Sequence, residues 1–298
     1  MSSDVGFVGL GQMGLPMVRN LAAAGFSVST YDLNPDACAA ASAYSGVSIA
    51  ENPAGVARQV PVVFTCLPSA AAVDAVYTGD DGFVGAGRSG LVTCDHSTMA
   101  PEVSRSLAQK MAEAGIHFLE APIFGIPLQA EEADVYFAVA GDESHVNAVG
   151  PFLEAMGRGY RYVGGTGVAH TMKILQNGLG MGHAALTSEI LVICERLGLD
   201  TGSFINLVKE ARALGQSVFF ERYADVLISG EKTNAGLLPV AVKDSSLARG
   251  LARDVGLPAP ILEEAASVFQ EAIDHGSADE ELTVVSRVAR DRRVDSDA

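Results

Sequence analysis

Cysteine is scarce in this sequence, with four residues among 298. None belongs to a Cys-x-x-Cys pair, so the sequence indicates neither a zinc site nor a disulfide framework. Cys66 and Cys94 end apolar runs, a placement typical of buried small side chains rather than of reactive thiols. The six histidines also lack metal-ligand spacing and have no obvious carboxylate partner, so we expect no metal ion.

Basic residues are also few: 20 Lys and Arg stand against 36 Asp and Glu, giving a net charge of −16. This balance argues against nucleic acid and against an anionic membrane surface as partners. The sequence has no run of 18 apolar residues and no basic amino-terminal region before its first strand-like segment. We therefore expect a cytoplasmic protein.

The composition is that of a compact globular chain, with 48% apolar and 19% charged residues. A chain of 298 residues is long for a single core. Two domains are therefore expected.

The most informative segment is the glycine-rich run Gly9-Leu10-Gly11-Gln12-Met13-Gly14. It follows an apolar run that ends at Val8 and opens a helix-like segment over Leu15–Ala24. In a dinucleotide fingerprint, the first glycine permits a tight turn, the second lets the backbone approach a pyrophosphate, and the third lets helix and strand pack closely. The helix N-terminus then binds the pyrophosphate. Gly9, Gly11, Gln12, Met13 and Gly14 are accordingly candidate cofactor-binding residues.

Asp32 ends the next strand-like segment, Ser27–Tyr31. A carboxylate there accepts hydrogen bonds from the ribose hydroxyls of NAD and repels the 2′-phosphate of NADP. No Arg or Lys follows in the next four residues, so the sequence favours NAD. Asn34 and Pro35 also read as an ordinary helix start, which is compatible with a ribose-binding Asp32.

The first half of the chain alternates strand and helix patterns, which predicts a doubly wound, mostly parallel sheet of the Rossmann type. The expected strands are Val5–Gly9, Ser27–Tyr31, Val60–Cys66, Leu91–Cys94, His117–Glu120, Val135–Ala140 and Tyr160–Val163. The expected helices are Leu15–Ala24, Pro35–Ser42, Ala70–Tyr77, Pro101–Ala114 and Glu143–Met156.

The pattern changes after residue 164. A proline-free segment from Val168 to Leu197 predicts one long helix, and the segments beyond it look helical. We therefore expect a Rossmann domain over 1–164, a connecting helix over 165–197 and an all-α domain over 198–298. The charge-rich end, roughly Ser286–Ala298, is expected to be a frayed tail.

Lys173 and Asn177 are four residues apart and share one face of the long helix. A partly desolvated lysine can act as a base or an acid near neutral pH, and an asparagine can hold the amine or a substrate oxygen. An ordinary surface lysine fits the spacing equally well. His170, three residues before Lys173, is interpreted as a polar helix position rather than a catalytic one, and His96 is a weak site candidate.

Five motifs in order resemble the β-hydroxyacid dehydrogenase family, which includes 3-hydroxyisobutyrate dehydrogenase and tartronate semialdehyde reductase. The resemblance runs through nearly the whole chain. The motifs are Gly6–Met17, Cys66-Leu67-Pro68, the D-x-S-T motif Asp95–Pro101, Gly167–Asn177 and Lys243-Asp244.

The resemblance implies a role for each motif. Lys173 would be the catalytic lysine, with Asn177 as its partner. Leu67, Pro68, Ser97 and Lys243 would lie at the cofactor, and Ser97 would also meet the substrate.

One motif departs from the family pattern. The family usually has D-A-P-V-S-G-G, whose Ser-Gly-Gly turn holds the substrate carboxylate, whereas this chain has Glu120–Pro127 with Phe124, Gly125 and Ile126 at that turn. Backbone N–H groups can still hold a carboxylate there. We favour the other interpretation, in which these substrate-binding positions select a different, larger or less polar substrate.

The sequence therefore predicts an NAD-dependent oxidoreductase that moves a hydride between nicotinamide and a small β-hydroxy acid or semialdehyde. One alternative is an imine reductase-like enzyme, against which Lys173 argues; another is a non-catalytic NAD-binding protein. The resemblance also implies a homo-oligomer, dimer or tetramer, because resembling enzymes bury the long helix between subunits.

Overall fold

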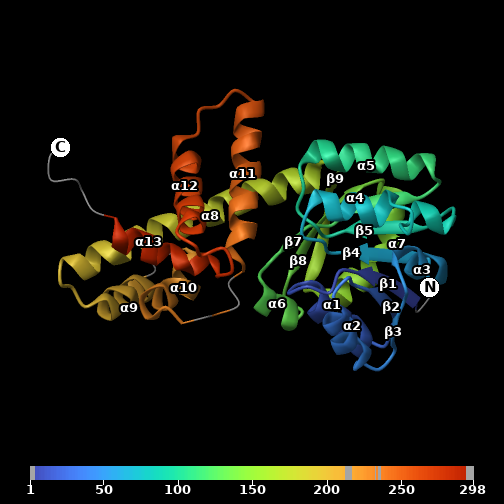
Figure 1. The fold of residues 1–298 in the computed structure, drawn as a ribbon, viewed down its shortest axis with the longest axis horizontal. Helices are drawn as coiled ribbons and strands as arrows, with labels where there is room; N and C mark the ends of the chain where they lie inside the picture. The colour runs from blue at the N-terminus through green and yellow to red at the C-terminus, as the bar shows by residue number, and fades with distance from the viewer. Residues whose placement is uncertain (1–3, 212–216, 232, 234–235, 293–298) are drawn as a thin grey trace. The chain divides into compact units, whose positions relative to one another are not determined.

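The structure, a computed structural model, describes residues 4–211, 217–231, 233 and 236–292 (Figure 1). The chain divides into two compact units, residues 1–173 and 174–298. The division falls inside one continuous helix, α8 (Val168–Arg196). The three-part division at residues 164 and 197 stays a prediction.

The first unit is built on a nine-stranded sheet, as counted over the described residues. Its strands are β1 (Asp4–Val8), β2 (Ser27–Tyr31), β3 (Val47–Ile49), β4 (Val62–Thr65), β5 (Val92–Asp95), β6 (His117–Glu120), β7 (Ile123–Phe124), β8 (Tyr136–Gly141) and β9 (Gly159–Gly164). The order is β3-β2-β1-β4-β5-β6-β8-β7, with β9 beside β8. The strands from β1 to β6 run parallel, and β8 is antiparallel to β6 and β7. The predicted doubly wound, mostly parallel sheet is confirmed.

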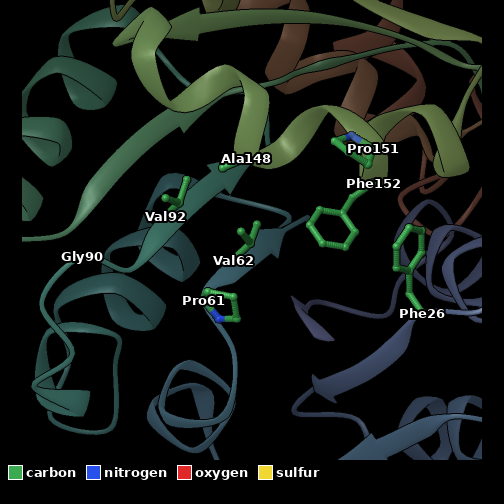
Figure 2. A pocket seen from close by; sticks show the side chains of 8 residues that line it. All are labelled: Phe26, Pro61, Val62, Gly90, Val92, Ala148, Pro151 and Phe152. Carbon is green, nitrogen blue, oxygen red and sulfur yellow. The ribbon is translucent and has the colours of Figure 1, made fainter. Parts of the chain in front are cut away.

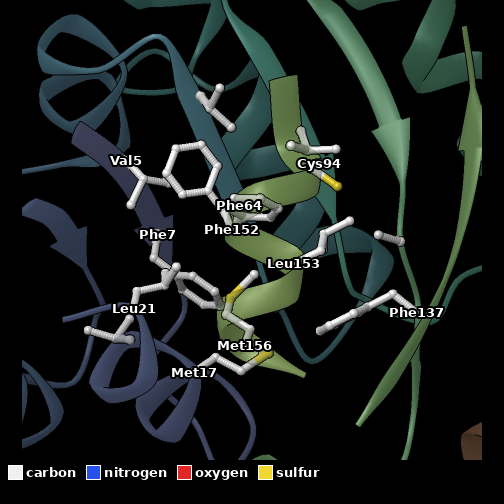
Figure 3. Close-up of a cluster of buried hydrophobic side chains, with 14 of the residues drawn as sticks. Val5, Phe7, Met17, Leu21, Phe64, Cys94, Phe137, Phe152, Leu153 and Met156 are labelled. Atoms are coloured by element: carbon white, nitrogen blue, oxygen red, sulfur yellow. The ribbon is translucent and has the colours of Figure 1, made fainter. Parts of the chain in front are cut away.

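Helices cover both faces of this sheet, as the apolar runs of its strands require. On one face lie α1 (Gly14–Ala23), α2 (Pro35–Ser42) and α7 (Val146–Met156), and on the other α3 (Pro53–Gln59), α4 (Ala70–Thr78) and α5 (Pro101–Glu113). Figure 3 shows the first core, in which Phe7, Phe64 and Phe152 gather between strands and helices. Val8, the residue after Phe7, belongs to the second core, as the period of two along a strand demands.

Four short elements were not predicted: β3, α3, β7 and α6 (Pro127–Glu131). Each has seven residues or fewer, too short for a periodic pattern to show. The helix expected over 143–156 begins as a 3-10 turn, Glu143–His145, before α7. A second 3-10 turn, Val84–Ala86, precedes β5.

The second unit is helical in its described residues, as predicted. After α8 come α9 (Thr201–Ala211), α10 (Val218–Ser229), α11 (Leu238–Asp254), α12 (Pro260–Asp274), the 3-10 turn Leu282–Val284 and α13 (Val285–Asp291). None of the helices in the described part of the chain is long and apolar enough to cross a membrane.

The prediction of a frayed tail from Ser286 is wrong for residues 286–291, which continue helix α13. Val285, Ser286 and Val288 are buried there. Tertiary packing therefore stabilises a segment whose charge-rich composition had predicted a frayed tail. Arg290 also pairs with Glu195 of α8 at 2.7 Å. Residues 293–298 lie outside the described residues.

Candidate active site

The last residues of five parallel strands lie in one row. Val8 pairs with Tyr31 of β2 and Thr65 of β4, Thr65 pairs with Asp95 of β5, and Asp95 pairs with Glu120 of β6. The strand order reverses at β1, because β2 and β3 extend the sheet to one side and β4 to the other. In such sheets a ligand binds outside the carboxyl ends of the strands at this reversal. The glycine-rich run begins there, directly after Val8.

The three glycines of the run meet three different constraints. Gly9 has a φ of +100°, and a Cβ there would collide with the carbonyl oxygen of Cys66. A Cβ at Gly14 would collide with the carbonyl oxygen of Gly9, so the helix packs directly on the turn. A Cβ at Gly11 would meet no protein atom within 4 Å. Protein packing therefore explains the first and third glycines but not the second, where the fingerprint predicts the close approach of a ligand.

The N-terminus of α1 is open to an anion. Met13 stands at its N-cap position and makes no side-chain cap hydrogen bond. Gln12 is exposed and Met13 half-buried. Uncapped backbone N–H groups at a helix N-terminus bind phosphate, so these residues fit the pyrophosphate of a dinucleotide.

Asp32 lies next to this loop. Its carboxylate accepts hydrogen bonds from the backbone N–H of Leu10 at 2.6 Å and of Asn34 at 2.7 Å. Asn34 in turn caps α2 through its side chain, which accepts from Asp36 N. The acid is therefore fixed beside the glycine-rich turn, where the ribose of a bound dinucleotide is expected.

Leu67 and Ser97 meet at the same edge of the sheet. The Leu67 backbone N–H donates to Ser97 Oγ at 2.9 Å, and the Leu67 side chain lies against Gly9. Ser97 Oγ donates to Asp95 Oδ1 at 2.8 Å. Pro68 is exposed at the tip of its loop. The structure thus brings the loops after β1, β4 and β5 together. Ser97 is the buried hub of this contact, because its hydroxyl bonds both Leu67 and Asp95.

A buried histidine lies between two carboxylates beside this hub. His170 is fully buried, and its Nε2 lies 3.0 Å from the Ser97 carbonyl oxygen and 3.6 Å from Asp95 Oδ2. Its Nδ1 lies 3.4 Å from Glu120 Oε1. The sequence showed no obvious carboxylate partner for any histidine, whereas the structure gives His170 two. The partners come from positions 95 and 120, too far along the chain for spacing to reveal them.

These contacts decide the charge of His170. Burial alone would lower the pKa of the imidazole, but the carboxylates of Asp95 and Glu120 outweigh burial and raise its pKa to about 9. Burial would likewise raise the pKa of Glu120, but His170, Ser104 and the Gly167 backbone N–H together lower it. An imidazolium and a carboxylate therefore face each other at neutral pH. The pKa of His96, by contrast, falls to about 4 because of burial, so this ring is neutral.

Lys173 lies one turn after His170 on α8 and is nearly buried, with 9% of its surface exposed. Its Nζ lies 5.4 Å from the centre of the Phe124 ring, within the range of a cation–π interaction. Phe124 belongs to an apolar cluster with Ala138, Ala140 and Ala169. The lysine thus reaches the segment that departs from the family motif.

The turn after Phe124 is closely packed. A Cβ at Gly125 would lie 2.7 Å from Val135 Cγ1, which explains this glycine without a ligand. The Ile126 backbone N–H donates to Gln129 Oε1 at 3.3 Å and so already has a partner within the chain. These two contacts weaken the interpretation in which the backbone of this turn alone holds a carboxylate.

The second unit contains the remaining predicted residues. Asn177, also 9% exposed, donates through Nδ2 to Asp244 Oδ2 at 2.6 Å. Lys243 Nζ lies 3.3 Å from Asp244 Oδ1. A Cβ at Gly178 would lie 3.2 Å from Ala248 Cβ, so α11 approaches α8 closely there. The amide of Asn177 is therefore oriented by a carboxylate that the Lys-Asp pair supplies.

A hollow of about 210 Å³ lies at the opposite edge of the sheet (Figure 2). It is apolar and is lined by Phe26, Pro61, Val62, Gly90, Val92, Ala148, Pro151 and Phe152. Pro61 and Gly90 precede β4 and β5, at the amino ends of these strands. None of the predicted site residues lines this hollow. Within the described residues, no group of three or more His, Cys, Asp or Glu is placed to hold a metal ion.

Two family models match this chain. Residues 4–165 match the family model described as the NAD binding domain of 6-phosphogluconate dehydrogenase. Residues 167–289 match the model described as NAD-binding of NADP-dependent 3-hydroxyisobutyrate dehydrogenase. These two models together cover almost the whole chain.

Individual relatives give the same result. The chain is 30% identical to 2-(hydroxymethyl)glutarate dehydrogenase of Eubacterium barkeri, over 96% of this chain and 95% of that one. A crystal structure of 3-hydroxyisobutyrate dehydrogenase from Salmonella typhimurium superposes with a TM-score of 0.87 at 26% identity, covering 96% of this chain and 99% of that one. An imine reductase of Streptomyces aurantiacus, 21% identical, superposes with a TM-score of 0.65 over 96% and 99% of the two chains, which shows a shared fold alone. The chain therefore belongs to the β-hydroxyacid dehydrogenase family.

Proposed function

We propose that this protein is an NAD-dependent dehydrogenase of a small β-hydroxy acid or semialdehyde, with Lys173 as the proton-transfer residue. The observation that carries the proposal is the place of Lys173. It is nearly buried on α8, and its amine lies against Phe124 in the segment that follows β6. The glycine-rich loop, Asp32 and Ser97 belong to the same unit and follow the carboxyl ends of its strands.

In this proposal each group has one task. The nicotinamide accepts or returns the hydride when it is bound. Lys173 takes the hydroxyl proton during oxidation and returns it to the developing oxygen anion during reduction. Asn177, one turn later on the same helix, holds the amine or the substrate oxygen, and Asp244 fixes the orientation of its amide. Gly11, Gln12, Met13 and Asp32 hold the dinucleotide.

A substrate panel tests the proposal directly. Purified protein is assayed for oxidation of short, longer and branched β-hydroxy acids with NAD and with NADP, and for reduction of cyclic imines with NADH and with NADPH. The amount of reduced nicotinamide is the readout, rising in the first assay and falling in the second. We expect turnover of hydroxy acids. Imine reduction without hydroxy-acid oxidation would instead favour the imine reductase alternative, for which the apolar Phe124 beside Lys173 is the one supporting observation.

Asp32 determines the cofactor preference in this proposal. We expect a higher kcat/KM with NAD than with NADP, and a smaller ratio in Asp32→Ala, because that variant no longer repels a 2′-phosphate. Asp36→Ala is the matched control, because Asp36 is an exposed acid four residues later that has no ribose-binding role in this proposal. An unchanged ratio in Asp32→Ala, or a wild-type preference for NADP, would refute the assignment.

Phe124 and Ile126 are proposed to select the substrate. Converting them to Ser and Gly gives the family turn, and a site that hydrogen-bonds its substrate discriminates more strongly than an apolar wall. We expect the double variant to gain kcat/KM for short polar acids such as glycerate relative to bulkier ones. Leu128→Ala, an exposed residue of α6, is the control. Equal relative kcat/KM values across the panel would mean that the departure does not affect selectivity.

We also propose that two copies associate through α8. Exposed apolar residues of α8, together with Leu197 directly after it, recur every three, four or seven positions. Each exposes between 38% and 70% of its surface: Leu175, Leu179, Leu186, Ile190, Ile193 and Leu197. Such a stripe on one helix is typical of a helix–helix interface. A second copy offers the same stripe, so the contact is self-complementary.

Size-exclusion chromatography with light scattering tests this association. We expect a homo-oligomer for the wild type and a smaller species for Leu179→Glu combined with Leu186→Glu, because two carboxylates would be desolvated at the contact. Leu257→Glu, a 61% exposed leucine outside the stripe, is the control and should keep the wild-type mass. A monomeric wild type would refute the proposal.

A further inference from the structure

The first turn of α8 is tied to the sheet by charged side chains. His170 lies in that turn, two residues after Val168. Its ring contacts Asp95 at the end of β5 through Nε2, at 3.6 Å, and Glu120 at the end of β6 through Nδ1, at 3.4 Å. All three side chains are completely buried. Two neighbouring strands of the sheet therefore hold one helical residue.

Glu120 also holds the backbone of the same turn. Its Oε1 accepts from the Gly167 N–H at 2.5 Å, and its Oε2 accepts from the His170 N–H at 3.4 Å. Ser104 of α5 donates its hydroxyl to the same carboxylate. A carboxylate that accepts the free N–H groups of a helix N-terminus is favoured by both hydrogen bonding and the helix dipole. Glu120 is thus a cap for α8 supplied by the sheet.

Asp95 connects these contacts of His170 and Glu120, the anchor of α8, to the loop of Ser97 at the carboxyl ends of the strands. It accepts hydrogen bonds from Thr65 Oγ1 at 2.6 Å, from Ser97 Oγ at 2.8 Å and from the Ser97 N–H at 3.1 Å. The His170 ring also meets the Ser97 carbonyl oxygen. Asp95 thus holds Ser97 and His170 at one point, while His170 and Lys173 lie three residues apart on one face of α8.

We propose that His170 is a positioning residue, which fastens the first turn of α8 to the ends of β5 and β6 and thereby sets where the Lys173 amine lies relative to Ser97. The proposal rests on the proposed function, because it requires Lys173 to be the proton-transfer residue. The groups that face the His170 ring are the carboxylates of Asp95 and Glu120 and the Ser97 carbonyl oxygen. His96, the neighbour of Asp95, is neutral and adds no charge.

A double-mutant cycle separates positioning from simple structural support. We expect His170→Gln to lower kcat by about 10- to 100-fold with little change in the KM for the cofactor, since small misplacements of a reacting group carry such losses. In a Lys173→Ala background, His170→Gln should cause no further loss, because there is no amine left to place. His275→Gln, at the exposed end of α12, is the control.

The outcomes distinguish this proposal from the proposed function. The positioning role is overturned if His170→Gln keeps the wild-type kcat, or if it lowers kcat equally in the wild-type and Lys173→Ala backgrounds. Either result leaves the assignment of Lys173 as the proton-transfer residue unchanged. Wild-type turnover in Lys173→Ala overturns both.

If His170→Gln does not fold, Glu120→Asp replaces it in the same cycle. This variant keeps the charge but is one methylene shorter, so its carboxylate no longer reaches the helix turn. We expect a smaller loss of kcat that again vanishes in Lys173→Ala, and an equal loss in both backgrounds overturns the proposal.

The charge of the anchor is measured separately. NMR of protein isotopically labelled at histidine gives one ring signal for each imidazole, and the signal that disappears in His170→Gln belongs to His170. This signal should titrate near pH 9 rather than near the ordinary value of 6.5. A neutral His170 ring at pH 7 would overturn the charged anchor, and titration near 9 supports it.

Discussion

Replacement of Lys173 by alanine should lower kcat by roughly 100-fold or more, the scale of general acid–base catalysis. The variant keeps the cofactor-binding loop, Asp32 and the anchor of α8, so its affinity for NAD should change little. Lys173→Arg should also be slow, because a guanidinium stays protonated and cannot accept the hydroxyl proton. Steady-state kinetics and isothermal titration with NAD measure the two quantities.

The control for this prediction is Lys110→Ala. Lys110 pairs with Asp74 on the surface at 2.9 Å, and half of its side chain is exposed. Its replacement by alanine should therefore leave turnover unchanged. If Lys173→Ala retained wild-type kcat, the assignment of the proton-transfer residue would be wrong. The family membership and the fold would not be affected.

Two glycines of the same loop should respond in opposite ways to substitution. Gly11→Val places its side chain where no protein atom lies within 4 Å, so Tm should stay near that of the wild type. The affinity for NAD should fall by at least roughly tenfold, about 1.4 kcal/mol, because the side chain occupies the approach of the pyrophosphate. Gly14→Ala forces a Cβ against the Gly9 carbonyl oxygen. It should therefore destabilise the fold by about 1–3 kcal/mol, the range of overpacked sites.

Differential scanning calorimetry and isothermal titration separate these two effects. Gly250→Ala is the matched control, since a Cβ on this α11 glycine meets nothing within 4 Å. It should preserve the affinity for NAD and add up to about 1 kcal/mol of stability, the helix preference of alanine over glycine. Wild-type NAD affinity in Gly11→Val would place the cofactor elsewhere.

The order of the elements could be predicted because it depends on local patterns. Apolar runs, glycine turns and proline helix starts are encoded within a few residues, so strands such as Ser27–Tyr31 and helices such as Pro35–Ser42 were predicted to the residue. The glycine-rich loop and Asp32 were also predicted as cofactor-binding candidates this way, because the turn and the strand end are local features. Short elements such as β3 and α6 were missed because fewer than two turns or two alternations show no period.

The amino-acid sequence by itself thus determined the alternation of strands and helices, the dinucleotide loop and, through its five motifs, the family. Only the tertiary structure decided which distant side chains meet. Asp95 and Glu120 end neighbouring strands whose register sets them side by side, and α8 brings His170 between them. The charge of His170 follows from those contacts and from burial, since an isolated imidazole in water would have its ordinary pKa. Register, burial and long-range ion pairs are properties of the folded chain, so no local pattern could have revealed this anchor.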